Sequence, residues 1–427
     1  MKPFLTLQSV ESVIGHMGAF PLLETELCTL DEAAGRFLAQ NFFATEDLPG
    51  FDRSTVDGFA LRARDVFGAQ EGNPALVECV AECRMGEVPD ISLAEGQTAR
   101  ILTGGMLPQG ADCVVMVEYS RPAGADLIEI TRSQAPGDNV IFRDDDAAAG
   151  SLLLKAGHRL RPQDIGLLAA FGVVDVEVRR KPLVAVLSTG DEVVPASQMP
   201  PPGKIRDINA HSIAALCREA GARAVRAGIV NDDAARLKAA IAQLAETHDV
   251  VVVSGGSSAG MRDHTVEIFE SLPQAQLLVH GVAISPGKPF ILATAIVNGR
   301  HVCLVGLPGH VTSALVCARV FLVPLLQHLQ GHAGSAKPPQ VTAVLTRSIA
   351  SAQGRRDYLR VRLRPLPVPQ GQRPQAGAAL QPQYEAEPIM GASGLISGIA
   401  AADGLMICPE NREGYDAGDT VFVELFR

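Results

Sequence analysis

The sequence contains no tryptophan, and aromatic residues make up only 4% of its 427 residues. Proteins that bind single-stranded nucleic acid stack bases on aromatic side chains, so such binding is disfavoured as a main activity. Positive charge is also scarce, because 47 acidic residues outnumber 37 basic ones and the formal net charge is −10. A chain this negative is poorly suited to follow a phosphate backbone or an anionic membrane surface. We therefore expect no nucleic acid and no membrane among its partners.

The sequence also lacks a cysteine motif and an uninterrupted membrane span. Its eight cysteines are scattered, and the one close pair, Cys79 and Cys83, has one residue too many for a zinc knuckle or a redox motif. The longest apolar stretch, 311–329, is interrupted by Arg319 and Pro324, which favours a buried core helix. The N-terminus lacks the apolar core of a secretory signal. Reduced thiols and these absences indicate a cytoplasmic protein.

Strand and helix patterns alternate between residues 181 and 330. Runs of valine and other aliphatic residues are typical of strands buried on both faces, and amphipathic segments preceded by capping residues are typical of helices. The predicted strands are 183–187, 224–230, 250–253 and 301–305, and the predicted helices are 211–219, 234–246 and 311–329. This alternation indicates a mostly parallel sheet covered by helices on both faces.

The rest of the chain predicts β-rich domains on either side of this α/β domain. Short strand-like runs, such as 113–118 and 127–130, are separated by glycine, proline and aspartate turns, and similar runs recur near the C-terminus. The fold class is therefore multi-domain α/β plus β. The expected domains are an α/β domain (1–24 and 181–330), a connecting arm (25–43 and 151–180), a β-rich domain (44–150) and a C-terminal β-barrel-like domain (331–427), in which the Pro/Gln-rich stretch 366–383 forms a loop.

Polar residues follow the predicted strands of the α/β domain, where ligands of such sheets bind. Ser188, Thr189 and Gly190 lead into Asp191 and Glu192 directly after the first strand. Mg²⁺ takes one or two carboxylates together with water and phosphate oxygens, so this loop predicts a metal and substrate site. Helix capping by the same residue types is the alternative.

Two further regions predict an anion site. Ser254, Gly255 and Gly256 offer hydroxyl and backbone N–H donors, although such a loop is often only a tight turn. Lys288 lies between two prolines and offers a point charge, although a lysine in a turn is often only solvated surface. Lys288 therefore supports an anion site only in combination with the Gly-Leu-Pro-Gly segment, which contains Pro308 and Gly309.

Three acidic segments have a simple structural alternative. Asp232 belongs to the cluster 231–233, which is a good N-cap for the helix that follows. Asp57 precedes a glycine and fits a hairpin turn. The run 143–146, which includes Asp146, fits a solvated surface turn.

Taken together, eight segments resemble the signature set of the molybdopterin molybdenumtransferases, the family that includes the E domain of gephyrin-type proteins. They occur in the family's order, at 49–60, 100–104, 188–192, 254–256 with Asp263, 286–289, 306–309, 354–360 and 391–395. The resemblance covers almost the whole chain.

The resemblance implies four domains, an elongated homodimer, and a Mg²⁺-dependent reaction in which adenylylated molybdopterin and molybdate give molybdenum cofactor and AMP. It places the family's site between the α/β domain of one subunit and the β-rich domains of the other. Enzymes of cofactor biosynthesis and recipient molybdoenzymes are further implied partners. The implied catalytic residues are Asp57, Thr103, Asp146, Asp263, Lys288 and Arg356. The implied metal ligands are Glu192, Asp232 and Asp263. The substrate-binding residues are those of the strand-end loops together with Pro308 and Ser393: Ser188, Thr189, Gly190, Ser254, Gly255, Gly256, Pro308, Gly309 and Ser393.

Several residues depart from the family's pattern, including the segment 255–260, which reads Gly-Gly-Ser-Ser-Ala-Gly in place of Gly-Gly-Val-Ser-Val-Gly. Asp144 stands where the family usually has glycine, and Ser285 stands where it often has a second lysine. His310 and Val311 follow the Gly-Leu-Pro-Gly segment in place of Asn-Pro. An added anion and a lost cation weaken oxyanion binding, whereas His310 restores positive charge when protonated. A catalytically altered paralogue that binds or carries the cofactor, or scaffolds a partner, is therefore the alternative function.

Overall fold

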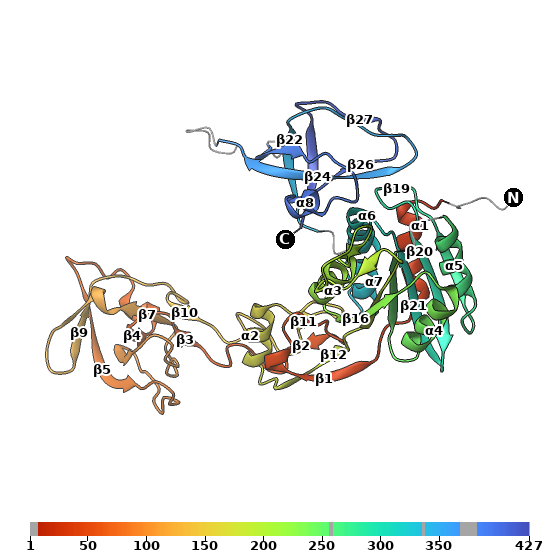
Figure 1. Ribbon diagram of the computed structural model, residues 1–427. Coiled ribbons are helices and arrows are strands. Elements are labelled where there is room, and N and C mark those ends of the chain that lie inside the picture. The colour runs from red at the N-terminus through yellow and green to blue at the C-terminus, as the bar shows by residue number, and fades with distance from the viewer. Residues whose placement is uncertain (1–6, 256–258, 335–337, 368–381, 427) are drawn as a thin grey trace. The chain divides into compact units, whose positions relative to one another are not determined.

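The computed structural model describes residues 7–255, 259–334, 338–367 and 382–426, with the backbone alone for 259–263 (Figure 1). The chain divides into two compact units, each of which is described by itself. The first unit comprises residues 1–40, 156–165 and 174–427, and the second comprises residues 41–155 and 166–173.

The first unit is built on a six-stranded sheet in the order β16-β13-β17-β21-β20-β18. The first four strands are parallel to one another, and β20 and β18 are antiparallel to their neighbours. The strands are β13 Leu183–Thr189, β16 Arg223–Val230, β17 Val250–Gly255, β18 Gln276–His280, β20 Ile291–Val297 and β21 Arg300–Leu307. The predicted strands of the α/β domain are confirmed, and the antiparallel edge was not predicted.

Helices cover both faces of this sheet. Successive valines of β17 point to opposite faces, so that Val250 and Val252 belong to one apolar cluster and Val251 and Val253 to the other. The first cluster includes side chains of α1, α3, α6 and α7, and the second includes side chains of α4 and α5. The helices are α1 Val10–Gly15, α3 Asn209–Glu219, α4 Ala234–Ala245, α5 Ala259–Glu270, α6 Val311–Cys317 and α7 Val323–Leu329.

A π-helical segment, Ala318–Leu322, joins α6 to α7. The helical stretch Val311–Leu329 is long and apolar enough to cross a membrane, but 61% of its most apolar window is buried inside the protein. Its buried residues, such as Phe321 and Leu326, pack in the first apolar cluster. The prediction of a core helix is confirmed.

The C-terminal part of the first unit is a small barrel. Five of its strands form a closed ring in the order β24-β25-β22-β28-β26, because β26 pairs with β24 as well as with β28. The short strand β19 adds to β24 in parallel. The strands are β19 Ile284–Ser285, β22 Gln340–Leu345, β24 Arg356–Pro365, β25 Tyr384–Pro388, β26 Gly404–Cys408 and β28 Thr420–Leu425, with helix α8 at Ile396–Ala400.

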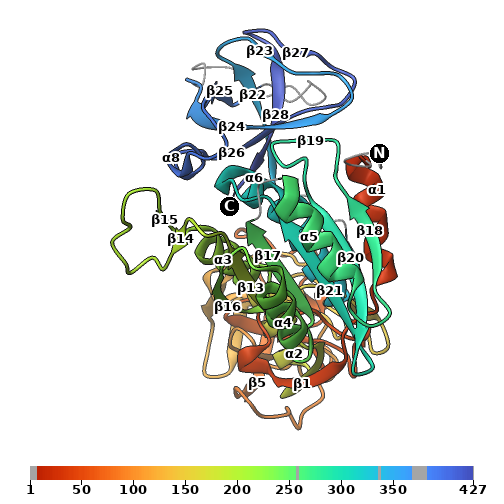
Figure 2. The same ribbon diagram turned by 45° about the vertical axis from the view of Figure 1, so that its right-hand side comes forward.

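Short pairs of strands complete the first unit. β1 Thr25–Thr29 pairs with β12 Asp175–Arg179, and β23 Ile349–Ala350 pairs with β27 Gly414–Tyr415. β14 Val193–Val194 and β15 Ile205–Arg206 form a parallel pair that stands apart from the large sheet (Figure 2).

The second unit holds another six-stranded sheet, in the order β7-β4-β6-β5-β9-β8. Its strands are β4 Gly58–Leu61, β5 Ala75–Cys83, β6 Gln97–Ile101, β7 Cys113–Met116, β8 Ser120–Pro122 and β9 Leu127–Ile130. Two short pairs accompany it, β3 Arg53–Ser54 with β10 Val140–Ile141 and β2 Phe42–Phe43 with β11 Leu152–Leu154. Helix α2 spans Pro162–Ala170.

The predicted fold class is confirmed, since an α/β sheet and β-rich parts occur in the same chain. The four domain boundaries stay a prediction. Most of the loop predicted at 366–383 lies outside the described residues.

Candidate functional site

Three neighbouring parallel strands end side by side and bring their loops together. Ser188 of β13 lies opposite Ser254 of β17, and Ser254 lies opposite Leu307 of β21. The three loops predicted to bind ligand therefore share one edge of the sheet, as expected for strands that run in the same direction.

Two glycines allow these loops to approach closely. Gly255 has a φ of +137°, and a Cβ there would collide with the backbone of Thr189 on the neighbouring strand. Gly190 has a φ of +144°, and a Cβ there would lie 2.6 Å from Oε2 of Glu192. The Glu192 carboxylate thus folds back over the backbone of Gly190, at the end of β13.

Asp232 brings a second carboxylate to the end of β13. The Thr189 hydroxyl donates to Oδ1 of Asp232 over 3.0 Å. The neighbouring Asp233 is the residue that caps α4, because its side chain accepts from the N–H of Arg236. Helix capping is therefore assigned to Asp233, and the Asp232 carboxylate faces the strand-end loops.

A buried polar network that the sequence analysis missed lies behind these loops. The Ser188 hydroxyl donates to Oδ2 of Asp207 over 2.9 Å, and Nδ2 of Asn209 donates to Oγ of Ser254 and to the carbonyl of Gly309 over 2.9 and 2.8 Å. Both Asp207 and Asn209 are buried. These contacts tie Asp207 to β13, and tie Asn209 of α3 to β17 and to the loop after β21.

A helix-start pattern could have pointed to this pair. Asp207 Oδ1 accepts from the N–H of Ala210, which is the N-cap interaction of an aspartate three residues upstream. The prediction placed the helix start two residues later, at 211, and so passed over the pair.

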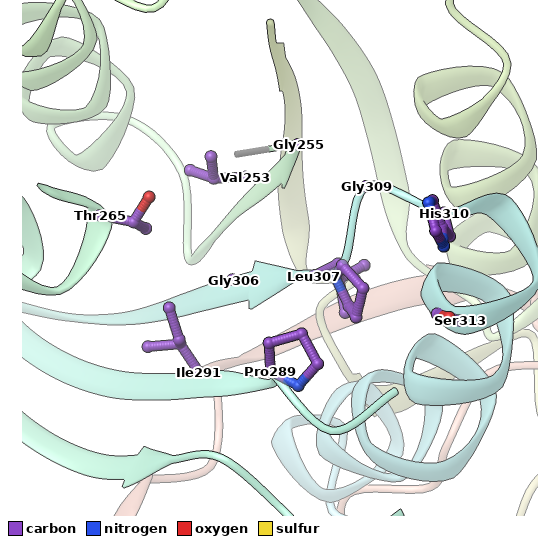
Figure 3. A pocket seen from close by; sticks show the side chains of 11 residues that line it. Val253, Gly255, Thr265, Pro289, Ile291, Gly306, Leu307, Gly309, His310 and Ser313 are labelled. Carbon is purple, nitrogen blue, oxygen red and sulfur yellow. The ribbon is translucent and has the colours of Figure 1, made fainter. Parts of the chain in front are cut away.

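A pocket of about 160 Å³ lies where β17, β21 and α6 meet (Figure 3). Its wall includes the predicted residues Gly255, Pro308 and Gly309, and also His310. Nδ1 of His310 lies 2.8 Å from the Ser393 hydroxyl, and the N–H of Thr312 donates to the Ser393 carbonyl over 3.0 Å. Ser393 of the barrel part is thereby tied to His310 in the wall of this pocket.

Lys288 is exposed and lies on a tight turn between β19 and β20. Gly287, which precedes it, has a φ of +131° and its carbonyl accepts from Sγ of Cys317 in α6 over 3.3 Å. β19 pairs with β24, so this turn is attached to the barrel part of the unit. Pro289, which follows Lys288, forms part of the pocket wall.

Arg356 is held in an ion-pair cluster. Its guanidinium donates to Glu11 of α1 over 2.5 Å and lies 3.0 Å from Oε1 of Glu410. Burial alone would lower the pKa of Arg356, but the hydrogen bonds to Glu11 and Glu410 outweigh it and raise the pKa. The structure thus shows a structural contact for Arg356, and its catalytic role stays a prediction.

The second unit holds the remaining predicted residues. The Thr103 N–H and hydroxyl both donate to Oδ1 of Asp57, over 2.8 and 2.7 Å. These two hydrogen bonds lower the pKa of Asp57, the backbone one having the larger effect. Asp146 is exposed, and its N–H donates to the carbonyl of Leu48 over 3.0 Å. Asp57 therefore does more than form a turn, while Asp146 lies on the exposed turn that its charge cluster suggests.

Within the described part of the chain, no group of three or more His, Cys, Asp and Glu side chains is arranged to hold a metal ion. Two of the predicted ligands, Glu192 and Asp232, lie at the loops that surround the end of β13. The predicted residues Gly256 and the side chain of Asp263 lie outside the described residues.

A parallel sheet whose strand ends gather hydroxyls, carboxylates and glycine loops defines an α/β protein with a candidate ligand site at the carboxyl ends of its strands. Family models match three parts of the chain: the MoeA N-terminal region (domains I and II) at 6–172, a probable molybdopterin binding domain at 185–328, and the MoeA C-terminal region (domain IV) at 342–426. The chain belongs to the MoeA family.

Similar proteins cover about three quarters of the chain or more. The molybdopterin molybdenumtransferase of Bacillus subtilis is 33% identical over 95% of this chain and 90% of its own length. That of a Nostoc species is 37% identical over 74% of this chain and 72% of its own. A solved structure, the MoeA molybdopterin biosynthesis protein of Pyrococcus horikoshii, is 35% identical, covers 99% of this chain and 100% of its own, and has a TM-score of 0.78.

Proposed function

We propose that this chain is a molybdopterin molybdenumtransferase, an enzyme that converts adenylylated molybdopterin and molybdate into molybdenum cofactor and AMP. The strand-end arrangement of the first unit supports this most directly. Two carboxylates, Glu192 and Asp232, lie beside hydroxyl and glycine loops that suit phosphate groups. The named activity of the Bacillus subtilis relative, which matches almost the whole chain, supports the same conclusion.

The chain's own residues bind and orient the substrates. Ser188, Thr189 and Ser254 lie at the strand ends beside Gly190 and Gly255, and we assign these segments to the phosphate groups of the substrate. The pocket between β17, β21 and α6 suits a small oxyanion, with Pro308 and Gly309 in its wall. Lys288, on the turn next to that wall, supplies a point charge for the anion.

The residues at the end of β13 fit a Mg²⁺ ion. Glu192 and Asp232 provide hard oxygen donors, and one or two carboxylates completed by water and phosphate oxygens are the usual protein ligands of this ion. We assign these two side chains, with Asp263 as the predicted third, to the metal. Bound there, Mg²⁺ would neutralise charge on the phosphate oxygens as the phosphoanhydride is cleaved.

The assembly and location follow from the same proposal. We propose a homodimer in the cytoplasm. It would receive adenylylated molybdopterin from other proteins of the pathway and pass its product on to others. Light scattering after gel filtration tests the dimer, since a single species of 45.0 kDa would contradict it.

The activity is tested by AMP release. Purified protein is mixed with adenylylated molybdopterin, and AMP is measured with molybdate, with Mg²⁺, with both and with neither. We expect release that requires both additions. Release that is absent with both present, from protein whose circular dichroism shows it to be folded, would overturn the proposed function.

A further inference from the structure

Two parts of the pocket wall are tied together by a side chain that is not among the described residues lining the pocket. Gly255, at the end of β17, and Gly309, after β21, both belong to the wall (Figure 3). Nδ2 of Asn209 in α3 donates to Oγ of Ser254 over 2.9 Å and to the carbonyl of Gly309 over 2.8 Å. Because Ser254 immediately precedes Gly255, one amide group sets the spacing between these two parts of the wall.

The orientation of the Asn209 amide follows from its partners. A carbonyl oxygen only accepts hydrogen bonds, so the amide nitrogen, and not the amide oxygen, must face Gly309. The Ser254 hydroxyl then accepts from the second N–H of the same group. Both protons of the amide are therefore used to hold the strand-end loops.

Asn209 is itself held in place. It lies at the start of α3 and is buried, with 9% of its surface exposed. Asp207, two residues earlier, accepts from the N–H of Ala210 over 3.1 Å and from the Ser188 hydroxyl over 2.9 Å. The start of α3 is thus attached to β13 as well, so the Asn209 amide is carried by an anchored helix end.

The oxygen of the Asn209 amide shows that this arrangement lowers stability. Within the described part of the chain, Oδ1 is buried and has no hydrogen-bond partner. A buried acceptor without a partner is unfavourable, because it has lost its contact with water and gained no bond in exchange. Native proteins contain few such groups, and local violations of this kind are expected at functional sites. The unpaired oxygen therefore favours a functional reason for asparagine at this position.

From this arrangement we infer that Asn209 is a positioning residue of the transferase, which holds Gly255 and Gly309 at the separation that binds the oxyanion substrate. The inference rests on the proposed function for the identity of that anion as molybdate. Asn209 acts through the Gly309 carbonyl and the Ser254 hydroxyl, and not by contact with the ligand. A displacement of about 1 Å can change a rate about 100-fold, so loss of these two hydrogen bonds should impair molybdate binding.

Two substitutions remove the donors, and a third serves as the matched control. Asn209→Asp keeps the size of the side chain but presents an acceptor to the Gly309 carbonyl, and Asn209→Ala removes the group without adding charge. The control is Gln330→Glu. Gln330 is also a buried amide whose nitrogen donates twice, to the carbonyls of Ala220 and Leu326, but it lies at the opposite end of α3.

The first measurement is AMP release over a range of molybdate concentrations, with adenylylated molybdopterin and Mg²⁺ saturating. We expect both Asn209 variants to raise the molybdate KM at least about tenfold, while kcat stays within about threefold of the intact enzyme. A purely structural role would lower the folded fraction, which reduces kcat and leaves KM unchanged. Gln330→Glu should behave in that second way.

The second measurement is titration calorimetry with molybdate alone, which needs no turnover. The stoichiometry reports the folded fraction, and the affinity reports the state of the pocket. Molybdate should bind at least about tenfold more weakly to Asn209→Ala than to the intact protein and to Gln330→Glu. Equal affinities in the intact protein and Asn209→Ala, a similar loss of affinity in Gln330→Glu, or no molybdate binding by the intact protein would overturn the inference.

The proposed function fails by a different result. Absence of AMP release by the intact protein contradicts the transferase, whereas the calorimetric comparison still decides the role of Asn209 at an oxyanion site. If the intact protein releases AMP and both Asn209 variants keep its molybdate KM, the transferase stands and the positioning role does not.

Discussion

At the residue scale, the Glu192 carboxylate lies over the backbone of Gly190 at the end of β13. We predict that Glu192→Gln keeps the fold and lowers Mg²⁺-dependent AMP release at least about 100-fold, or about 2.7 kcal/mol of transition-state stabilisation. The glutamine has nearly the same shape but no charge for a metal. The measurement is turnover across a Mg²⁺ titration, with the thermal unfolding midpoint as a control for folding. Turnover equal to that of the intact enzyme would remove Glu192 from the site.

Asp232 and Asp233 are adjacent but have different partners, which allows a matched comparison. Asp232 accepts from the Thr189 hydroxyl, whereas Asp233 caps α4. We predict that Asp232→Asn lowers Mg²⁺-dependent turnover about tenfold or more, since the carboxylate charge is lost at the metal. Asp233→Asn should leave turnover and stability within about 0.5 kcal/mol of the original, because asparagine caps helices as well as aspartate. If both substitutions lowered turnover equally, the loss would come from negative charge near the loop and not from a specific role of Asp232 at the metal.

At the scale of elements, the packing of β13 against the end of β17 depends on Gly255. Its φ of +137° and the collision that a Cβ would make with Thr189 both act against any other residue. We predict that Gly255→Ala lowers the free energy of unfolding by about 3 kcal/mol or more in urea. The control is Gly203→Ala, whose φ is +83° but whose Cβ would meet no neighbour, and which should cost only about 1 kcal/mol. If Gly255→Ala and Gly203→Ala lowered the free energy of unfolding by similar amounts, the positive φ of each glycine would account for the loss, and the close approach of Gly255 to Thr189 would not.

The elements themselves were largely predictable from local pattern. β17 was predicted from four successive valines, and the predicted helix at 234–246 agrees closely with α4. Strand β20 and the edge strand β18 were missed, because an antiparallel addition to a parallel sheet is decided by tertiary pairing and not by local sequence.

The candidate site was predictable only where a loop follows a strand along the chain. Contacts between distant segments could not be read from the sequence. Asn209 reaches Gly309 across 100 positions, and Ser393 reaches His310 across 83. Only the fold brings such pairs together, and neither contact leaves a spacing pattern. The family resemblance supplied Ser393, but not its contact with His310.

At the scale of the whole molecule, stability in acid depends on a carboxylate buried among arginines at the start of the strands. Asp249, directly before β17, is buried and accepts from Arg180, from Arg300 and from the N–H of Leu183. Burial alone would raise the pKa of Asp249, but the hydrogen bonds from Arg180 and Leu183 and the charge of Arg180 outweigh it, so the pKa lies below its usual value. Arg180 also pairs with Glu24, whose pKa is lowered by a backbone hydrogen bond and by this contact.

The sign of the pH dependence follows from these lowered pKa values. A carboxyl group with a lowered folded-state pKa stabilises the fold fully above its unfolded pKa of about 3.9, and this contribution is lost as the pH falls through the folded value. We predict that Asp249→Asn lowers the free energy of unfolding by about 3 kcal/mol at pH 7, because it leaves two arginines without their buried partner. The difference from the intact protein should shrink as the pH falls from 5 to 3. Urea unfolding at pH 7, 5, 4 and 3 measures it, with the exposed Asp31→Asn as the control. A difference that stays constant down to pH 3 would mean that Asp249 stabilises the protein through packing and not through its charge.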